Sequence, residues 1–226
     1  MNLFKEKQLS KLVKYSEDGK IKSKTYYKGK ELHRDDDKPA IIEYWYNGDI
    51  YSKKWYKDGK IHRGEDKPAI ITYSPAGGVI SSQEWYKNGK KHRNDDKASL
   101  ILYDKSGRIV YQQWYDEKGR FHRKEGPASI FWFFDSDFKP DTNSDITSDF
   151  KPDINYAKHI ISGENICRIE KWYKNGKIHN ENGPAIIYYK NGNKYREEYW
   201  NDNVFLRFSP MCYPNGQIRE EWIPCT

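Results

Sequence analysis

The chain has 226 residues and a formal net charge of +7, with 36% hydrophobic, 32% charged and 16% aromatic residues. This length suffices for one sizeable domain or a continuous array, but the modest hydrophobic content argues against a thick core. Aromatic and β-branched side chains fit a pleated, half-buried surface, so the composition favours a thin sheet with one solvent-exposed face.

In chain order, residues 1–12 are expected to form an N-terminal cap, with no helix beyond one short turn near Asn2 to Leu12. Residues 13–134 are predicted to hold four copies of a repeating unit and the start of a fifth. Residues 135–163 form an acidic polar insert, and residues 164–226 complete the fifth copy and add a sixth and a final half copy. The whole chain, residues 1–226, is therefore interpreted as a single repeat array.

The repeating unit combines an aromatic pair, a glycine turn, a histidine and an apolar run, as in WYKDGKIHRGEDKPAII from Trp55 and WYKNGKKHRNDDKASLI from Trp85. The signature histidines are His33, His62, His92, His122 and His179. The first four of these are 29 or 30 residues apart, which gives about seven copies of a roughly 30-residue unit. Stacked units of this kind are stabilised mainly by their neighbours.

Asn-Gly and Asp-Gly pairs mark the turns. They favour two-residue hairpin loops, because both central residues must adopt a positive φ. These pairs are Asp18-Gly19, Asn47-Gly48, Asp58-Gly59, Asn88-Gly89, Asn175-Gly176, Asn191-Gly192 and Asn215-Gly216. Runs such as AIIEYWY and IVYQQWY between them are rich in strand formers, and a proline before the apolar run suits a strand start. The sequence therefore predicts an all-β, elongated array of antiparallel hairpins, as a twisted sheet or a solenoid.

The pattern W-Y-x-N-G-x-x-H-R-x-x-x-x-P-A-x-I, alternating with Y-x-N-G, resembles the MORN-like repeat proteins, and is similar to repeat arrays of giant DNA viruses and some bacteria. The resemblance covers about Val13 to Trp222, except for the insert. Typical MORN units are shorter than this one and have a Y-x-G-x-W core. The resemblance implies hairpin arrays that are used for protein contacts, oligomerisation or scaffolding.

The expected compartment follows from the cysteines and the hydropathy. Cys167, Cys212 and Cys225 are odd in number and lack a CxxC spacing, which argues against a disulfide framework and against a structural zinc site. Neither a signal peptide nor a membrane-spanning stretch is apparent. We expect a cytoplasmic protein, in the host cytoplasm or the virion if the chain is viral, without metal or cofactor.

The recurring His-Arg pairs, each followed by acids, raise the question of acid/base or metal chemistry. An active site needs one asymmetric cluster, whereas these residues recur in every unit, about 10 Å apart if the histidines lie two strands from one another. We therefore expect the histidines and arginines to satisfy loop carbonyls and the acids that follow them. We find no nucleophile elbow, phosphate loop or metal pattern, so the chain is not expected to be an enzyme.

Two recurring sets are candidate binding residues. The tryptophans of the aromatic pairs either pack in the sheet or form a stacking platform for bases or partner side chains: Trp55, Trp85, Trp114 and Trp172. Lysines beside the turns are expected to form a basic stripe parallel to an acidic one, and the two could partly neutralise each other: Lys57, Lys60, Lys87, Lys90, Lys174 and Lys177.

The insert carries the hexamer SDFKPD twice, from Ser136 to Asp141 and from Ser148 to Asp153. We expect it to be the recognition element peculiar to this chain, with Phe138, Pro140, Phe150 and Pro152 as its candidate contacts. The predicted function is a non-catalytic scaffold for protein–protein interaction or self-assembly, through a sheet face, an edge or the insert. The alternative is binding of nucleic acid or an anionic surface through the lysines; neither a membrane surface nor a small-molecule substrate is the expected partner.

Overall fold

The computed structural model describes residues 8–75, 77–133, 166–190, 192–209, 211–212 and 218–220. The chain divides into two compact units, Met1–Ala128 and Ser129–Thr226, and each is described by itself. The described residues form strands and connections and contain no helix, which confirms the predicted all-β class of antiparallel hairpins. No helix in this part of the chain has the length and apolarity needed to cross a membrane.

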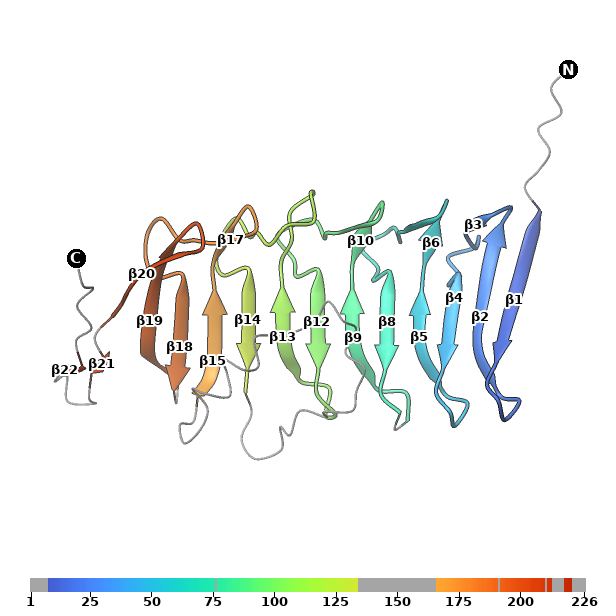
Figure 1. Ribbon diagram of the computed structural model, residues 1–226, viewed down its shortest axis with the longest axis horizontal. Helices are drawn as coiled ribbons and strands as arrows, with labels where there is room; N and C mark the ends of the chain where they lie inside the picture. Colours follow the sequence, from blue (N-terminus) through green and yellow to red (C-terminus); the bar gives the residue numbers. More distant parts are fainter. Residues whose placement is uncertain are drawn as a thin grey trace, which may run out of the picture. The chain divides into compact units, whose positions relative to one another are not determined.

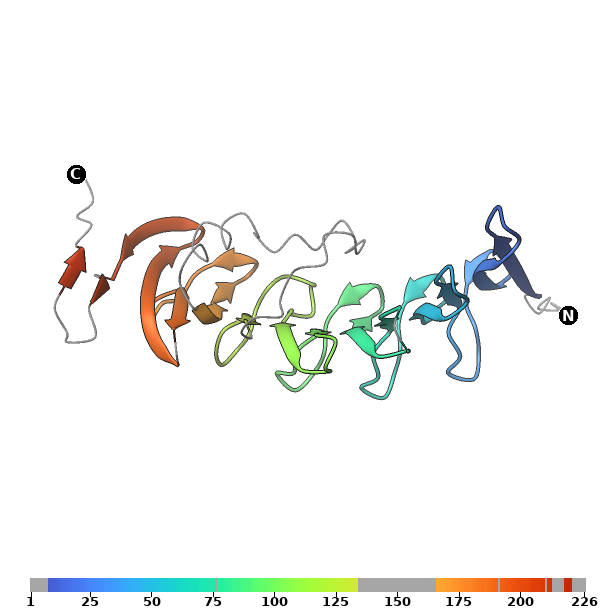
Figure 2. The same cartoon turned by 90° about the horizontal axis from the view of Figure 1, so that it is seen from below.

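The main sheet of unit 1 is a row of antiparallel strands that follow one another in chain order, side by side in one layer (Figures 1 and 2). Each strand pairs with the strands before and after it. In order, the strands are β1 (Leu9–Tyr15), β2 (Ile21–Lys28), β4 (Ile41–Tyr44), β5 (Ile50–Lys54), β8 (Ile70–Tyr73), β9 (Ile80–Glu84), β12 (Leu100–Tyr103) and β13 (Ile109–Gln113). Strand β1 begins at Leu9, so the end of the expected cap is a strand and not a helical turn.

Short hairpins lie at one end of the main strands, at the top of Figure 1. They are β6 (Tyr56–Lys57) with β7 (Lys60–Ile61), and β10 (Tyr86–Lys87) with β11 (Lys90–Lys91); β3 (Glu31–Leu32) pairs with the end of β2. The turns of β6–β7 and β10–β11 have positive φ at both central residues, for example 48° at Asp58 and 75° at Gly59. The two-residue turns predicted there are therefore confirmed.

The other Asx-Gly pairs of unit 1 form longer loops, so the prediction of two-residue turns is wrong for them. Ser16 N donates to Lys20 O at 2.9 Å and Trp45 N to Asp49 O at 2.8 Å, which leaves three residues in each loop. Only Gly19 and Gly48 have a positive φ, 79° and 90°. This is a turn followed by one left-handed residue, and the pairing register shifts beside both loops. Asn191 and Asn215-Gly216 lie outside the described residues.

A third kind of turn has acidic residues, not glycine, at its two central positions. Asp36 and Asp37 have φ of 61° and 50°, and Lys38 N donates to Asp35 O at 3.3 Å. Glu65-Asp66 and Asp95-Asp96 repeat this geometry. Asp is one of the few residue types that enter the left-handed region readily, which explains a turn without glycine at its central positions. We call these three segments the acidic turns.

Burial in unit 1 is concentrated where each main strand meets its acidic turn. Ala40 and Ala69 are fully buried directly before β4 and β8, and the indole rings of Trp55 and Trp85 are buried beside them. Trp55 N donates to Ala69 O at 2.8 Å, so the aromatic pair and the apolar run of one copy lie side by side here. Pro39 and Pro68 precede the strand starts, as predicted.

Unit 2 has its own antiparallel row. In order, it comprises β14 (Ser129–Trp132), β15 (Ile166–Lys171), β18 (Ile186–Lys190), β19 (Asn193–Asn201) and β20 (Val204–Phe208). Two further pairs are β16 (Tyr173–Lys174) with β17 (Lys177–Ile178), and β21 (Met211–Cys212) with β22 (Ile218–Glu220). Asn175 and Gly176 have φ of 54° and 86°, which confirms the predicted two-residue turn.

The core of unit 2 is small and partly polar. Ile169, Ile186 and Tyr188 form its buried cluster. The fully buried carboxylate of Glu198 accepts hydrogen bonds from Tyr188 Oη at 3.0 Å and from Trp200 Nε1 at 2.9 Å. Arg196 Nη2 lies 3.0 Å from the same carboxylate, so the buried charge is paired.

Candidate functional site

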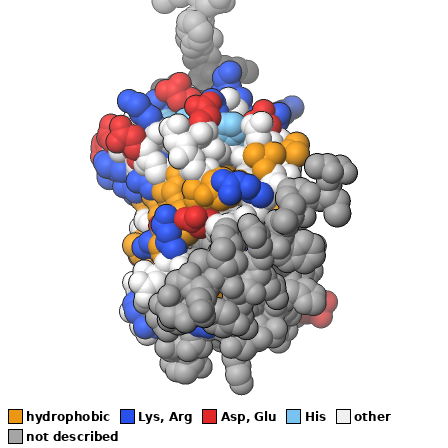
Figure 3. All heavy atoms as spheres, turned by 90° about the vertical axis from the view of Figure 1, so that its left-hand side faces the viewer, with side chains coloured by type: hydrophobic (Ala, Val, Ile, Leu, Met, Phe, Trp, Pro, Cys, Tyr) orange, Lys and Arg blue, Asp and Glu red, His pale blue; other side chains and the backbone are white. Residues whose placement is uncertain are grey.

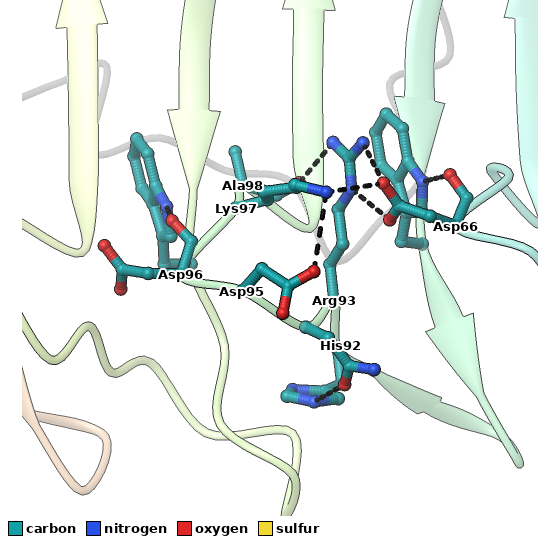
Figure 4. Close-up of polar contacts among 10 residues, drawn as sticks. Asp66, His92, Arg93, Asp95, Asp96, Lys97 and Ala98 are labelled. Carbon is teal, nitrogen blue, oxygen red and sulfur yellow. Dashed lines mark hydrogen bonds and ion pairs between the residues drawn. The ribbon is translucent and has the colours of Figure 1, made fainter.

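The His-Arg-acid segments of unit 1 meet at the junctions between neighbouring copies. In Figure 4, Arg93 lies between Asp66 of the preceding copy and the carbonyl of Ala98 in its own copy. Its Nε donates to Asp66 Oδ1 at 2.7 Å and its Nη2 to Oδ2 at 2.9 Å. Lys97 Nζ adds a third contact to this carboxylate at 3.0 Å. The aspartate is thus held by a bidentate, charge-assisted pair.

The indole ring completes the junction. Arg93 stacks over Trp85 with its guanidinium carbon 3.9 Å from the ring centroid, and Trp85 Nε1 donates to Asp66 O at 3.0 Å. One acidic residue therefore binds the next copy twice, through its carboxylate and through its carbonyl. We call this set of contacts the junction clamp.

The junction clamp recurs with nearly constant geometry. Arg63 Nε lies 2.8 Å from Asp37, and Arg123 Nε lies 2.8 Å from Asp96. The guanidinium carbons of Arg63 and Arg123 lie 3.8 Å and 4.1 Å from the rings of Trp55 and Trp114. Trp55 and Trp114 donate to Asp37 O and Asp96 O, each at 2.9 Å. The recurrence shows that these residues connect one copy to the next.

The arginines were expected to pair with the acids that follow them, and this expectation is wrong. Their carboxylate partners precede them by 26 or 27 residues, because the acidic turn of one copy lies against the aromatic pair of the next. The residue after each acidic turn contributes instead: Lys67 and Lys97 bind Asp37 and Asp66.

The junction contacts lower the pKa of Asp37 and of Asp66. Hydrogen bonds from Arg63, supported by Lys67, lower the pKa of Asp37 to about 2 although partial burial opposes this shift. Arg93 and Lys97 have the same effect on Asp66, whose pKa is also lowered to about 2. Both carboxylates are therefore charged at every pH near neutrality, which suits ion pairing and excludes them as general acids.

The histidines link each copy to the following hairpin. His33 Nδ1 accepts a hydrogen bond from Asp58 N at 3.1 Å, and His62 Nδ1 accepts one from Asn88 N at 3.2 Å. His92 Nδ1 instead contacts Tyr115 O at 3.0 Å. Burial, together with the charges of Lys57 and Lys87, lowers the pKa of His62 below its usual value, and a neutral ring is what the acceptor role requires.

No group of three or more His, Cys, Asp or Glu side chains within the described ranges is placed to hold a metal ion. The Nδ1 atoms of His33, His62 and His92 contact the following copy. The Nε2 atom of His33 contacts Asp35 at 2.8 Å, one of the acids that follow it, as predicted. The arrangement provides repeated cohesion between copies.

The lysines beside the short turns form a basic ridge, defined by Lys57, Lys60, Lys87 and Lys90. In the strand register, Lys57 of β6 lies opposite Lys60 of β7, and Lys87 of β10 lies opposite Lys90 of β11. All four side chains are exposed, and none has a carboxylate partner among the residues that the structure describes. Gly89 N donates to Ile61 O at 2.8 Å, so the two hairpins contact each other directly.

The expected neutralisation between a basic and an acidic stripe is therefore not observed along the basic ridge. The acids are engaged with the arginines and with Lys67 and Lys97, which leaves the hairpin lysines unpaired. In unit 2 the equivalent lysines differ, because Lys174 pairs with Glu181, and Lys177 lies 3.7 Å from Asp202.

The four candidate tryptophans fall into two groups. Trp55, Trp85 and Trp114 are buried beneath arginines, as the packing interpretation requires. Trp172 is only half-buried, and its copy has Asn180 in place of the arginine. Asn180 Nδ2 retains the contact with the proline carbonyl, at 2.8 Å from Pro184 O, but cannot cover the ring. Trp172 is thus the most accessible of the four indoles.

The insert residues Phe138, Pro140, Phe150 and Pro152 lie outside the described residues, and their role stays a prediction. Comparison with protein-family models, with curated proteins and with solved structures found no match to this chain. The resemblance to MORN-like repeats also stays a prediction. The structure defines the chain as an all-β protein of antiparallel hairpins.

Proposed function

We propose that this chain is a non-catalytic scaffold that binds protein partners, or further copies of itself, through surfaces that its junction contacts leave open. The observation that carries the proposal is the junction clamp itself. The arginines, aspartates and histidines are the residue types that could take part in catalysis, but here they hold neighbouring copies together. At three junctions the arginine Nε lies 2.7 to 2.8 Å from a carboxylate. Binding capacity then belongs to the edges and to the basic ridge.

The first open surface is the edge strand β1. It pairs with β2, and no other described strand pairs with it. Leu9, Leu12 and Tyr15 on this strand are 62%, 44% and 61% exposed. Unpaired backbone groups beside exposed apolar side chains support strand addition by another polypeptide. In unit 2, β20 exposes Val204 and Leu206, and Figure 3 shows hydrophobic side chains on the described surface at this end.

Association through β1 is tested by light scattering and chemical cross-linking over a range of concentrations. A Leu9→Lys/Leu12→Lys variant should reduce association, because lysine on an edge strand disfavours pairing. Val79→Lys is the matched control, since Val79 is also an exposed apolar residue, at 39%, but lies in a loop. A chain that stays monomeric and captures no protein, with or without these changes, would reject the scaffold.

A second candidate function is binding of nucleic acid, favoured by the unpaired lysines of the basic ridge. Two hairpins in direct contact present four positive side chains. Burial lowers the pKa of His62, and the charges of two of these lysines, Lys57 and Lys87, add to the effect. Neutralising four phosphates predicts a slope of about −3 to −4 in log K against log salt for duplex DNA. Replacing Lys57, Lys60, Lys87 and Lys90 by Gln should remove that slope, whereas Gln at Lys11, Lys14, Lys22 and Lys30, which are also exposed, should not.

A further inference from the structure

The first copy contains a junction clamp without its aspartate. Arg34 stacks over Tyr26 with its guanidinium carbon 3.8 Å from the ring centroid, and its Nη1 donates to Pro39 O at 3.2 Å. Arg63 makes the same two contacts in the second copy, at 3.8 Å to Trp55 and 3.2 Å to Pro68 O. The guanidinium of Arg34 is therefore held by its own copy in the orientation that binds a carboxylate elsewhere.

The carboxylate partner is what differs. Arg63 Nε and Nη2 bind Asp37 at 2.8 and 2.9 Å, whereas Arg34 makes no ion pair with any residue in the described ranges. Lys38 contacts only Asp36 of its own acidic turn, at 3.1 Å, while the equivalent Lys67 also binds Asp37. The guanidinium that binds a carboxylate in later copies thus has no such partner in the first, and Lys38 makes one of the two ion pairs that Lys67 makes.

The pairing of β1 explains the missing partner. Leu12 pairs with Thr25 just before the first aromatic pair, as Ile41 pairs with Lys54 just before the second. An acidic turn with Asp37 comes before Ile41, whereas β1 is already paired with β2 from Leu9 onwards, so no described aspartate precedes Leu12 at this place. The place beside Arg34 is instead a pocket of about 190 Å³, lined by Leu9, Tyr26, Arg34 and Lys38 and also by two carboxylates, Asp35 and Asp36, which pair with His33 and Lys38.

We propose that this pocket binds an acidic segment of a partner protein, whose carboxylate takes the place that Asp37 occupies against Arg63. The ligand chemistry is defined by the internal copies: a carboxylate bidentate to the guanidinium and bonded to a lysine ammonium. The junction aspartates of a second copy are not available to this pocket, because Asp37, Asp66 and Asp96 are already bound to Arg63, Arg93 and Arg123.

The proposal rests on the protein-binding function proposed above and assigns one surface to it. Its probe is a capped peptide with the sequence Gly-Glu-Asp-Lys-Pro-Ala, which is that of Gly64 to Ala69, titrated into the full chain. The readout is the NMR shift of the Arg34 Nε–H. We expect saturable binding that Arg34→Gln weakens by at least about tenfold, because one bidentate charged pair contributes roughly 1.5–3 kcal/mol.

Two controls make the result specific. Lys38→Gln should weaken binding by a smaller factor, and Lys22→Gln, which removes an exposed charge on β2, should leave it unchanged. The peptide with Asn in place of its Asp should not bind. Equal shifts with the Asn peptide, or binding that survives Arg34→Gln, would overturn the site.

The nature of the ligand is tested in a further arm. Acetyl-aspartate amide has the carboxylate but lacks the flanking chain, so it should bind more weakly than the peptide. Equally tight binding would overturn the assignment to a protein segment, in favour of a small carboxylate. A negative result in the peptide experiments would not change the result of the light-scattering experiments on β1. Those experiments test the proposed scaffold function independently of Arg34.

Discussion

Arg93 and Asp66 are 27 residues apart in the chain, yet they form a bidentate ion pair with N–O distances of 2.7 and 2.9 Å. The pair is strengthened by its setting, because Arg93 is only 17% exposed and stacks on Trp85. Cohesion between neighbouring copies is therefore concentrated on a few side chains.

Arg93→Lys should destabilise the chain by about 1–3 kcal/mol, because lysine can neither bind the carboxylate through two nitrogens nor stack flat on the indole. Urea unfolding followed by circular dichroism measures this change. Arg108→Lys is the control: Arg108 also pairs with an aspartate, Asp104, but is 49% exposed, and less than about 1 kcal/mol is expected there. An equal decrease in the free energy of unfolding for both variants would show that the junction arginine contributes no more than an exposed one.

Stability should fall when the pH is lowered from about 4 towards 2. The folded-state pKa values of Asp37 and Asp66 are about 2, below the reference value of 3.8, so the unfolded chain binds protons first. Their contribution is complete above pH 4 and is lost as the pH falls through this range. Asp37→Asn/Asp66→Asn should be less stable at neutral pH and show a shallower acid decline of the urea midpoint. An unchanged slope would contradict the assignment.

Gly89→Ala should cost about 1–2 kcal/mol, because Gly89 has a φ of +85° in a two-residue turn and a Cβ there would meet Lys60 at 3.9 Å. Gly64→Ala provides the contrast. Gly64 is not left-handed and a Cβ at this position would meet nothing within 4 Å, so a neutral effect or a gain of about 0.4–1 kcal/mol is expected. Thermal unfolding of the two variants side by side distinguishes them.

Glu65→Asn should stabilise the chain by up to about 1 kcal/mol, because Glu65 has a φ of 57° and asparagine tolerates that conformation better than glutamate. The ion pair that is lost, with Lys67, has a glutamate 80% exposed and contributes little. Glu125→Asn, at a position without a positive φ, should give no such gain. Loss of stability at Glu65 would mean that its charge outweighs its backbone strain.

The sequence is sufficient to predict the strands and the tight hairpins, because their signals are local. Asn-Gly favours a turn with two positive φ values, as Asn88-Gly89 forms, and short strands flank it. The same reasoning is wrong for the loop at Asn47-Gly48. The dipeptide is identical, and only the pairing of Trp45 with Asp49 decides that three residues fit between them.

The candidate site is less predictable, because its contacts cross from one copy to the next. Nothing beside Arg63 in the sequence indicates Asp37, and Asp35 to Asp37 carry no glycine that would mark a turn. The repeat length could have identified the partner. A side chain that faces the adjacent copy is separated from its partner by nearly one repeat length in the sequence. The empty place beside Arg34 is visible only when the occupied ones are known.

The replacement of arginine by Asn180 affects which part of the protein unfolds first. Links between adjacent copies can break singly, so damage at one place need not spread along the strands. Trp172, without a guanidinium above it, is the least covered of the four candidate indoles. Limited proteolysis should therefore remove pieces from unit 2 first and leave a trimmed, still folded remnant of unit 1, whose three arginine-sealed indoles stay protected longest.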